Sequence, residues 1–171
     1  GIDPQRIVIS GESGGGNLPI APGLSLKRDG DLDIVSGLYA LCPYIAGQWP
    51  QDDLPSSIEN NGILIGLHSN RGAMAYGLDQ LDSKNPLAWP LFATVDDLKG
   101  FPRTMISVNE CDPLRDEGLV FYRRLMEAGV AARCREVRGT CHAAELFINA
   151  FPEISGDTAA DLARFAKADR S

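Results

Sequence analysis

The chain has 171 residues, of which 44% are hydrophobic and 23% charged, and this is typical of a single globular domain. Its formal net charge of −7 argues against a nucleic-acid partner, because binding a phosphate backbone needs clustered lysine and arginine. The uncharged stretch over residues 18–26 is too short to cross a bilayer and contains two prolines, so we expect no transmembrane segment.

The first third of the chain predicts two buried strands around one helix. Residues 1–4 are typical of a loop that enters a strand, not of a signal peptide, so the chain is expected to begin in mid-domain. Residues 6–10 form a short apolar run that predicts a buried parallel strand, followed by a glycine-rich turn and a helical segment to about residue 29. A second buried strand is expected over residues 34–42.

The middle of the chain, about residues 43–100, is rich in proline and predicts a loop-rich, cap-like insertion. Only residues 71–81 have the pattern of a helix there.

The last part of the chain returns to alternating elements. We predict strands over residues 104–108 and 131–137, and a helix over 116–128 between them. A helical segment is expected from residue 143 to Pro152, and a last helix over 157–168. The alternation predicts an α/β fold, in which a mostly parallel sheet is covered by helices, with residues 1–171 in one domain.

The segment Gly11-Glu12-Ser13-Gly14-Gly15 fits the G-x-S-x-G pattern of a nucleophile elbow. It follows a predicted buried strand and opens a helical segment, as an elbow requires. Side chains two residues away on either side of the serine are expected to collide in so sharp a turn. The N–H group of Gly14 then becomes an oxyanion-hole donor. A glycine-rich phosphate loop is the alternative, although the lysine of a P-loop is absent.

A serine nucleophile needs a base, and the chain has two histidines, His68 and His142. His68 lies in the proline-rich region, where a surface or capping role is expected. His142 lies between a predicted strand and a helical segment, at the carboxyl end of the strands, where α/β proteins build their sites. We therefore predict His142 as the base, with an ordinary loop histidine as the alternative.

The third member of the predicted triad is a carboxylate that orients the histidine. Asp112 follows the third strand and completes the order Ser13, Asp112, His142, which is that of the α/β-hydrolases. Glu110 is a competitor, whereas Asp116 and Glu117 are explained as charges that favour a helix N-terminus.

The four cysteines have neither metal-ligand spacing nor the density of a disulfide scaffold, so free thiols are expected and no metal is predicted. Because Cys111 precedes Asp112 and Cys141 precedes His142, a disulfide between these two remains the alternative.

These motifs together resemble the hormone-sensitive-lipase-like carboxylesterases of the α/β-hydrolase fold, in particular their brefeldin A esterase-like branch. The resemblance covers nearly the whole chain in order. The matching segments are residues 11–18 (GESGGGNL), 42–45 (CPYI), 58–62 (IENNG), 85–90 (NPLAWP), 109–118 (NECDPLRDEG) and 139–142 (GTCH).

The resemblance implies a cofactor-free serine esterase that acts on small-molecule esters, with a cap over an acyl pocket and Ser13, Asp112 and His142 as its triad. A non-catalytic binding module, and an amidase or peptidase on the same fold, stay open as alternatives. Tyr44 and the aromatic residues Trp49, Trp89 and Phe92 are placed near such a pocket or in an ordinary core, and we assign them no role. A cytoplasmic location is expected.

Two departures from the family pattern stand out. The family's second oxyanion element, an HGGG-type loop, is absent, so the chain is expected to be the C-terminal portion of the fold. It would then need an N-terminal companion fragment for activity, and a homodimer is a further possibility. Pro19 and Pro22 lie in the helix after the elbow, which is expected to be kinked or shortened.

Overall fold

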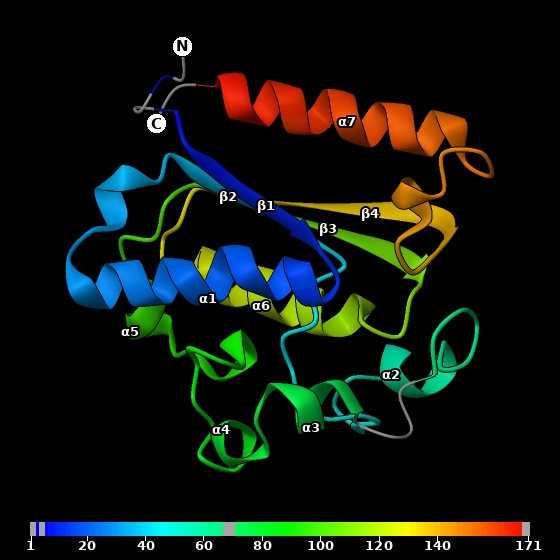
Figure 1. The fold of residues 1–171 in the computed structure, drawn as a ribbon, viewed down its shortest axis with the longest axis horizontal. Helices are drawn as coiled ribbons and strands as arrows, with labels where there is room; N and C mark the ends of the chain where they lie inside the picture. The colour runs from blue at the N-terminus through cyan, green and yellow to red at the C-terminus, as the bar shows by residue number, and fades with distance from the viewer. Residues whose placement is uncertain (1–2, 4–5, 67–70, 169–171) are drawn as a thin grey trace.

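Four parallel strands form the centre of the computed structural model, which describes residues 3, 6–66 and 71–168 (Figure 1). Their spatial order is β1-β2-β3-β4, and every neighbouring pair is parallel. The strands are β1 (Val8–Glu12), β2 (Gly37–Leu41), β3 (Thr104–Cys111) and β4 (Ala132–Cys141). The α/β fold with a parallel sheet, predicted from the alternation of elements, is confirmed.

Helices cover both faces of this sheet (Figure 1). Helices α1 (Gly14–Asp29) and α6 (Arg115–Glu127) lie on one face, and α7 (Pro152–Lys167) lies on the other. The side chains of β2 alternate accordingly. Leu38 and Ala40 pack into the core beneath α1 and α6, whereas Tyr39 and Leu41 pack with Phe165 of α7.

The region between β2 and β3 contains only short helices and turns, as its prolines predict. Its predicted helix over 71–81 is instead two short helices, because Gly77 between them has a φ of 134° that ends the first one. The elements are α2 (Ser56–Glu59), α3 (Arg71–Tyr76), α4 (Leu78–Asp82), the 3₁₀ turn η2 (Pro90–Phe92) and α5 (Val95–Leu98).

Several predicted boundaries differ from the observed ones. Residue 34, where the second strand was predicted to begin, is instead the last residue of the 3₁₀ turn η1 (Leu32–Ile34). The predicted third and fourth strands continue to residues 111 and 141. The helical segment predicted after residue 143 was wrong. Only a 3₁₀ turn, η3 (Ala144–Leu146), forms there, because Phe147 leaves helical geometry, with a φ of −89° and a ψ of 65°. Helix α7 begins five residues earlier than predicted, with Pro152 in its first turn.

The helix after the elbow was expected to be kinked or shortened, and it is not shortened, because α1 continues for 16 residues through both prolines. Each proline removes one backbone hydrogen bond from the helix. Pro19, Ile20 and Leu24 are buried against the sheet, and this packing offsets the loss.

No helix in the described part of the chain is long and apolar enough to cross a membrane.

Candidate active site

Ser13 lies in a sharp turn between the end of β1 and the start of α1. A Cβ atom on Gly11 would lie 1.9 Å from the carbonyl oxygen of Gly15, so only glycine fits there. The expected collision two residues after the serine was wrong, since a Cβ on Gly15 would meet nothing within 4 Å. The crowded position is Gly16, where a Cβ would lie 2.6 Å from the carbonyl oxygen of Leu41.

Backbone strain is concentrated around this turn. The non-glycine residues with positive φ in the described chain include Ser13 at 59°, Cys42 at 39° and Ala143 at 55°, at or just beyond the ends of β1, β2 and β4. Strained residues persist only where the surrounding structure holds them, and they gather at functional sites.

His142 brings the three predicted residues together. Its Nε2 atom lies 2.9 Å from Oγ of Ser13, and its Nδ1 atom lies 2.8 Å from Oδ2 of Asp112. His142 is 5% exposed and Asp112 is fully buried, so water is largely excluded from their contact. The geometry follows from the sheet, because each of the three residues comes within two positions of the carboxyl end of a parallel strand.

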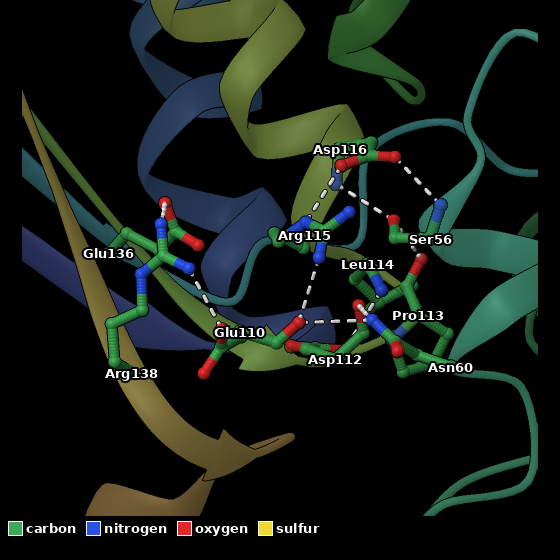
Figure 2. Close-up of polar contacts among 10 residues, drawn as sticks. All are labelled: Ser56, Asn60, Glu110, Asp112, Pro113, Leu114, Arg115, Asp116, Glu136 and Arg138. Carbon is green, nitrogen blue, oxygen red and sulfur yellow. Dashed lines mark hydrogen bonds and ion pairs between the residues drawn. The ribbon is translucent and has the colours of Figure 1, made fainter.

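Asp112 is held by contacts on its other side (Figure 2). Its Oδ1 atom accepts a hydrogen bond of 2.9 Å from the N–H group of Leu114. The side-chain amide of Asn60 donates to the carbonyl oxygens of Asp112 and Glu110, at 3.1 and 3.0 Å. Arg115 donates to the same Glu110 carbonyl. The carboxylate of Asp112 is therefore fixed in the direction of His142.

The alternative acid, Glu110, is engaged elsewhere. Its carboxylate accepts hydrogen bonds from Arg138 at 2.8 Å and from the N–H group of Gly139 at 2.7 Å. The hydrogen bond from Gly139, followed by that from Arg138, lowers the pKa of Glu110. Glu110 thus fixes the turn that precedes His142 and does not contact its ring.

The two acids at the start of α6 do more than favour its N-terminus. Asp116 accepts a hydrogen bond of 2.7 Å from the N–H group of Ser56, which links α6 to α2 (Figure 2). Glu117 is buried, accepts hydrogen bonds from the N–H groups of Ile45 and Ala46, and burial raises its pKa. Glu117 lies in the first turn of α6, as expected, and in addition it anchors the segment after β2 inside the fold.

Gly14 is the first residue of α1, where backbone N–H groups have no acceptor within the helix. Its position directly after Ser13 suits the predicted oxyanion donor. His68, the other histidine, lies outside the described residues. Cys111 and Cys141 are register partners on β3 and β4, and both are free thiols.

Acidic groups surround the imidazole of His142. Burial lowers the pKa of His142, but the hydrogen bond and charge of Asp112, with Glu12 and Glu145, outweigh burial and raise it. Glu12 directly precedes Ser13, and burial followed by the charge of Glu145 raises its pKa to about 8. Glu145 in turn accepts a hydrogen bond of 2.8 Å from the side chain of Asn109.

The sequence analysis did not identify the residues that surround the triad. Asn60 lies in the segment 58–62, which resembles the family, but nothing in that segment indicates a contact with Asp112. Glu12 was assigned only as the variable residue of the elbow pattern. The groups that act on its carboxyl group lie just after three other strands.

One group in the described chain has the donor types of a metal site, namely Glu12, Cys42 and His142, whose ligand atoms lie within 4.8 Å of one another. Both ring nitrogens of His142 already contact Ser13 and Asp112. Burial also raises the pKa of the Cys42 thiol, which opposes the thiolate form that metals bind. These residues therefore fit a metal ion poorly.

A cavity of about 270 Å³ lies beside the serine turn and is mostly apolar. Tyr44, Tyr76 and Trp89 form its aromatic part, and both tyrosine rings meet Trp89 edge to face, at 5.4 and 5.2 Å. Gly14, Asn17, Gly72 and Ala75 complete the lining. The rings of Trp49 and Tyr44 stack, with their centroids 4.2 Å apart, and Trp49 belongs to a separate core cluster. Phe92 packs against the cluster that contains Trp89.

The sequence matches the family model described as alpha/beta hydrolase fold over residues 1–146. The chain belongs to the α/β-hydrolase family. Among solved structures, this α/β-hydrolase superposes on esterase Est22 with a TM-score of 0.95 and 60% identity, over 98% of this chain and 50% of that one.

A second solved structure, brefeldin A esterase, is described as a bacterial homologue of human hormone-sensitive lipase. It superposes with a TM-score of 0.89 and 42% identity, over 95% of this chain and 47% of that one. The resemblance to hormone-sensitive-lipase-like carboxylesterases is thus confirmed.

An esterase of Acinetobacter venetianus is 31% identical over 166 residues, which cover 97% of this chain and 53% of that protein. The α/β-hydrolase chain therefore spans about half the length of the relatives that it matches.

Proposed function

We propose that this α/β-hydrolase chain carries the catalytic triad of a serine carboxylesterase, with Ser13 as nucleophile, His142 as base and Asp112 as the residue that orients His142. The observation that carries the proposal is the continuous hydrogen-bonded series from Ser13 Oγ through His142 to Asp112, with distances of 2.9 and 2.8 Å. Esterases among its relatives support ester hydrolysis as the reaction.

In the proposed reaction, Ser13 Oγ attacks the ester carbonyl carbon and its proton passes to Nε2 of His142. The N–H group of Gly14 donates to the carbonyl oxygen, which becomes negatively charged in the tetrahedral intermediate. His142 then gives the proton to the departing alcohol, and an acyl-Ser13 ester remains. Water, deprotonated by His142, releases the acid and restores Ser13.

The cavity beside Gly14 is proposed to hold the acyl group. The departing alcohol must lie against His142 to receive its proton, whereas the cavity is lined from α1 and from the 43–100 region. A cavity of about 150 Å³ binds benzene. At about 270 Å³, this one accommodates a single aromatic ring or an acyl chain of similar size. In this proposal α3 acts as part of a cap over the acyl group.

A second oxyanion donor is proposed to come from outside residues 1–171. The half-length match to the relatives supports this, and loss of one such donor typically costs about 100- to 1,000-fold in rate. The chain alone is then expected to turn over p-nitrophenyl esters slowly. Co-expression with the N-terminal half of Est22 is expected to raise the rate.

Labelling with a fluorophosphonate tests the nucleophile directly. The wild-type chain, alone or with the Est22 half, is expected to become labelled on Ser13, as located by mass spectrometry of the peptide. The Ser13→Ala variant should stay unlabelled, and Ser10→Ala, three residues earlier in β1, serves as control. Labelling that persists in Ser13→Ala would contradict the proposal. Faster turnover of p-nitroanilides than of p-nitrophenyl esters would identify an amidase instead.

A further inference from the structure

Glu12 is half-buried, but its carboxyl group is enclosed beside His142 without an ordinary hydrogen-bond partner in the described chain. Both of its carboxyl oxygens are inaccessible to solvent, and neither has an N–H or O–H donor within the described ranges 6–66 and 71–168. The weakly donating thiol of Cys42 and a ring nitrogen of His142 lie within 4.8 Å of them. A buried carboxyl group in such surroundings destabilises a fold, which is the pattern expected of a functional group.

The titratable groups around Glu12 lie at the carboxyl ends of the other three strands. Cys42 follows β2, Asp112 follows β3, His142 follows β4, and Glu145 lies in η3. All of these groups except His142 are acids, so the imidazole is the one group in this set that can become a cation. Glu145 is held toward β3 by Asn109, and its second carboxyl oxygen is also buried without a partner in the described chain.

We propose that Glu12 is a positioning residue for the reaction: its carboxyl group, next to Glu145, favours the protonated imidazole of His142 from a direction that Asp112 does not occupy. The catalytic part of this inference rests on the proposed function. When Ser13 passes its proton to His142, a positive charge appears on the ring. Asp112 meets that charge at Nδ1, and ionised Glu12 adds a second favourable interaction in a site of low dielectric.

The charge on Glu12 depends on pH. Burial and the charge of Glu145 raise the pKa of Glu12 to about 8, so this group is mostly neutral at pH 7 and ionises as the pH passes 8. Ionisation adds negative charge beside His142 and therefore stabilises its protonated form. At a pH where His142 is already neutral in the free enzyme, ionised Glu12 favours the transfer of the Ser13 proton to the imidazole, so kcat should be higher in the wild type than in Glu12→Gln above pH 8, and the difference should shrink below pH 8.

The direct test is an NMR titration of the histidine rings, which needs no catalytic activity. The chain has two histidines, so a His68→Gln variant assigns the signal of His142. We expect the protonated imidazole of His142 to persist to higher pH in the wild type than in Glu12→Gln, because the charge of Glu12 that favours it appears as the pH passes about 8. Glu145→Gln should shift the titration of His142 in the same direction, and Glu12→Asp, which keeps the charge, should shift it less.

Glu127→Gln is the matched control, because it removes the same charge from the exposed end of α6. It should leave the pKa of His142 unchanged. An identical His142 titration in wild type and folded Glu12→Gln would overturn the inference, whatever the enzymatic result. If Glu12→Gln lowers the pKa of His142 but the wild-type chain is never labelled by fluorophosphonate, the electrostatic coupling is confirmed and the proposed esterase function is contradicted.

Discussion

The two oxygens of Asp112 have different partners. Oδ2 contacts Nδ1 of His142 and Oδ1 accepts from the N–H group of Leu114, so the carboxylate cannot rotate away without losing a bond. An amide at this position would present an N–H group to either His142 or Leu114, where an acceptor is required.

Asp112→Asn is therefore expected to lower kcat for p-nitrophenyl esters by about 10,000-fold, because the imidazole is then held in the wrong tautomer. The pH dependence should change too. Asp112 raises the pKa of His142, and the base must be neutral, so wild-type activity rises as the pH passes that raised value. Loss of the carboxylate should move the residual acid limb to lower pH. A pH–rate profile checks both results, and activity close to wild type would contradict the triad.

At the residue scale, the three residues of the proposed triad were predictable because each follows a segment whose pattern is typical of a parallel strand. Such runs end at one edge of a sheet, so the meeting of Ser13, Asp112 and His142 follows from topology alone. Glu12 and Asn60 were not predictable in this way. Their roles depend on which loop folds over which strand end, and a local pattern does not contain that information.

At the scale of elements, the strands and long helices follow local signals, whereas short segments follow tertiary contacts. The helix predicted after His142 is only η3, since the chain leaves helical geometry at Phe147. Helix α1 continues through Pro19 because its buried face packs on the sheet. In both cases packing outweighs the local propensity that guided the prediction.

Helix α3 offers a test of the proposed acyl pocket, because two of its neighbouring residues face differently. Ala75 lines the cavity, whereas Met74 is 62% exposed and lies outside the lining. Ala75→Phe is expected to fill much of the space beside Tyr76 and Trp89. It should lower kcat/KM for p-nitrophenyl phenylacetate at least tenfold while changing kcat/KM for the acetate ester little. Even one methylene group that no longer fits an apolar pocket changes the activation free energy by about 1–3 kcal/mol.

Met74→Phe introduces the same side chain one residue away and should leave the ratio between the two esters unchanged. Steady-state rates for both esters, measured in both variants, decide the matter. An equal loss for acetate and phenylacetate in Ala75→Phe would mean that the cavity does not hold the acyl group.

At the scale of the whole molecule, the site depends on a sheet that is packed from both sides. Phe165 of α7 makes an edge-to-face contact with Tyr39 at 5.5 Å, and the guanidinium of Arg103 lies 4.2 Å above its ring. The hydroxyl group of Tyr39 also donates to Asp161 of α7 at 2.8 Å. These contacts lie on the face opposite α1 and α6, so they hold the sheet without touching the triad.

Phe165→Ala is accordingly expected to lower the free energy of unfolding by about 3–5 kcal/mol, the usual cost of removing a buried phenylalanine ring. Urea denaturation measures this loss. Phe147→Ala makes the same replacement at a side chain that is 45% exposed, and it should cost much less. Under conditions where Phe165→Ala remains folded, fluorophosphonate labelling of Ser13 should proceed as in the wild type, because the elbow is built on the other layer. Slower labelling of the folded variant would show that α7 also supports the site.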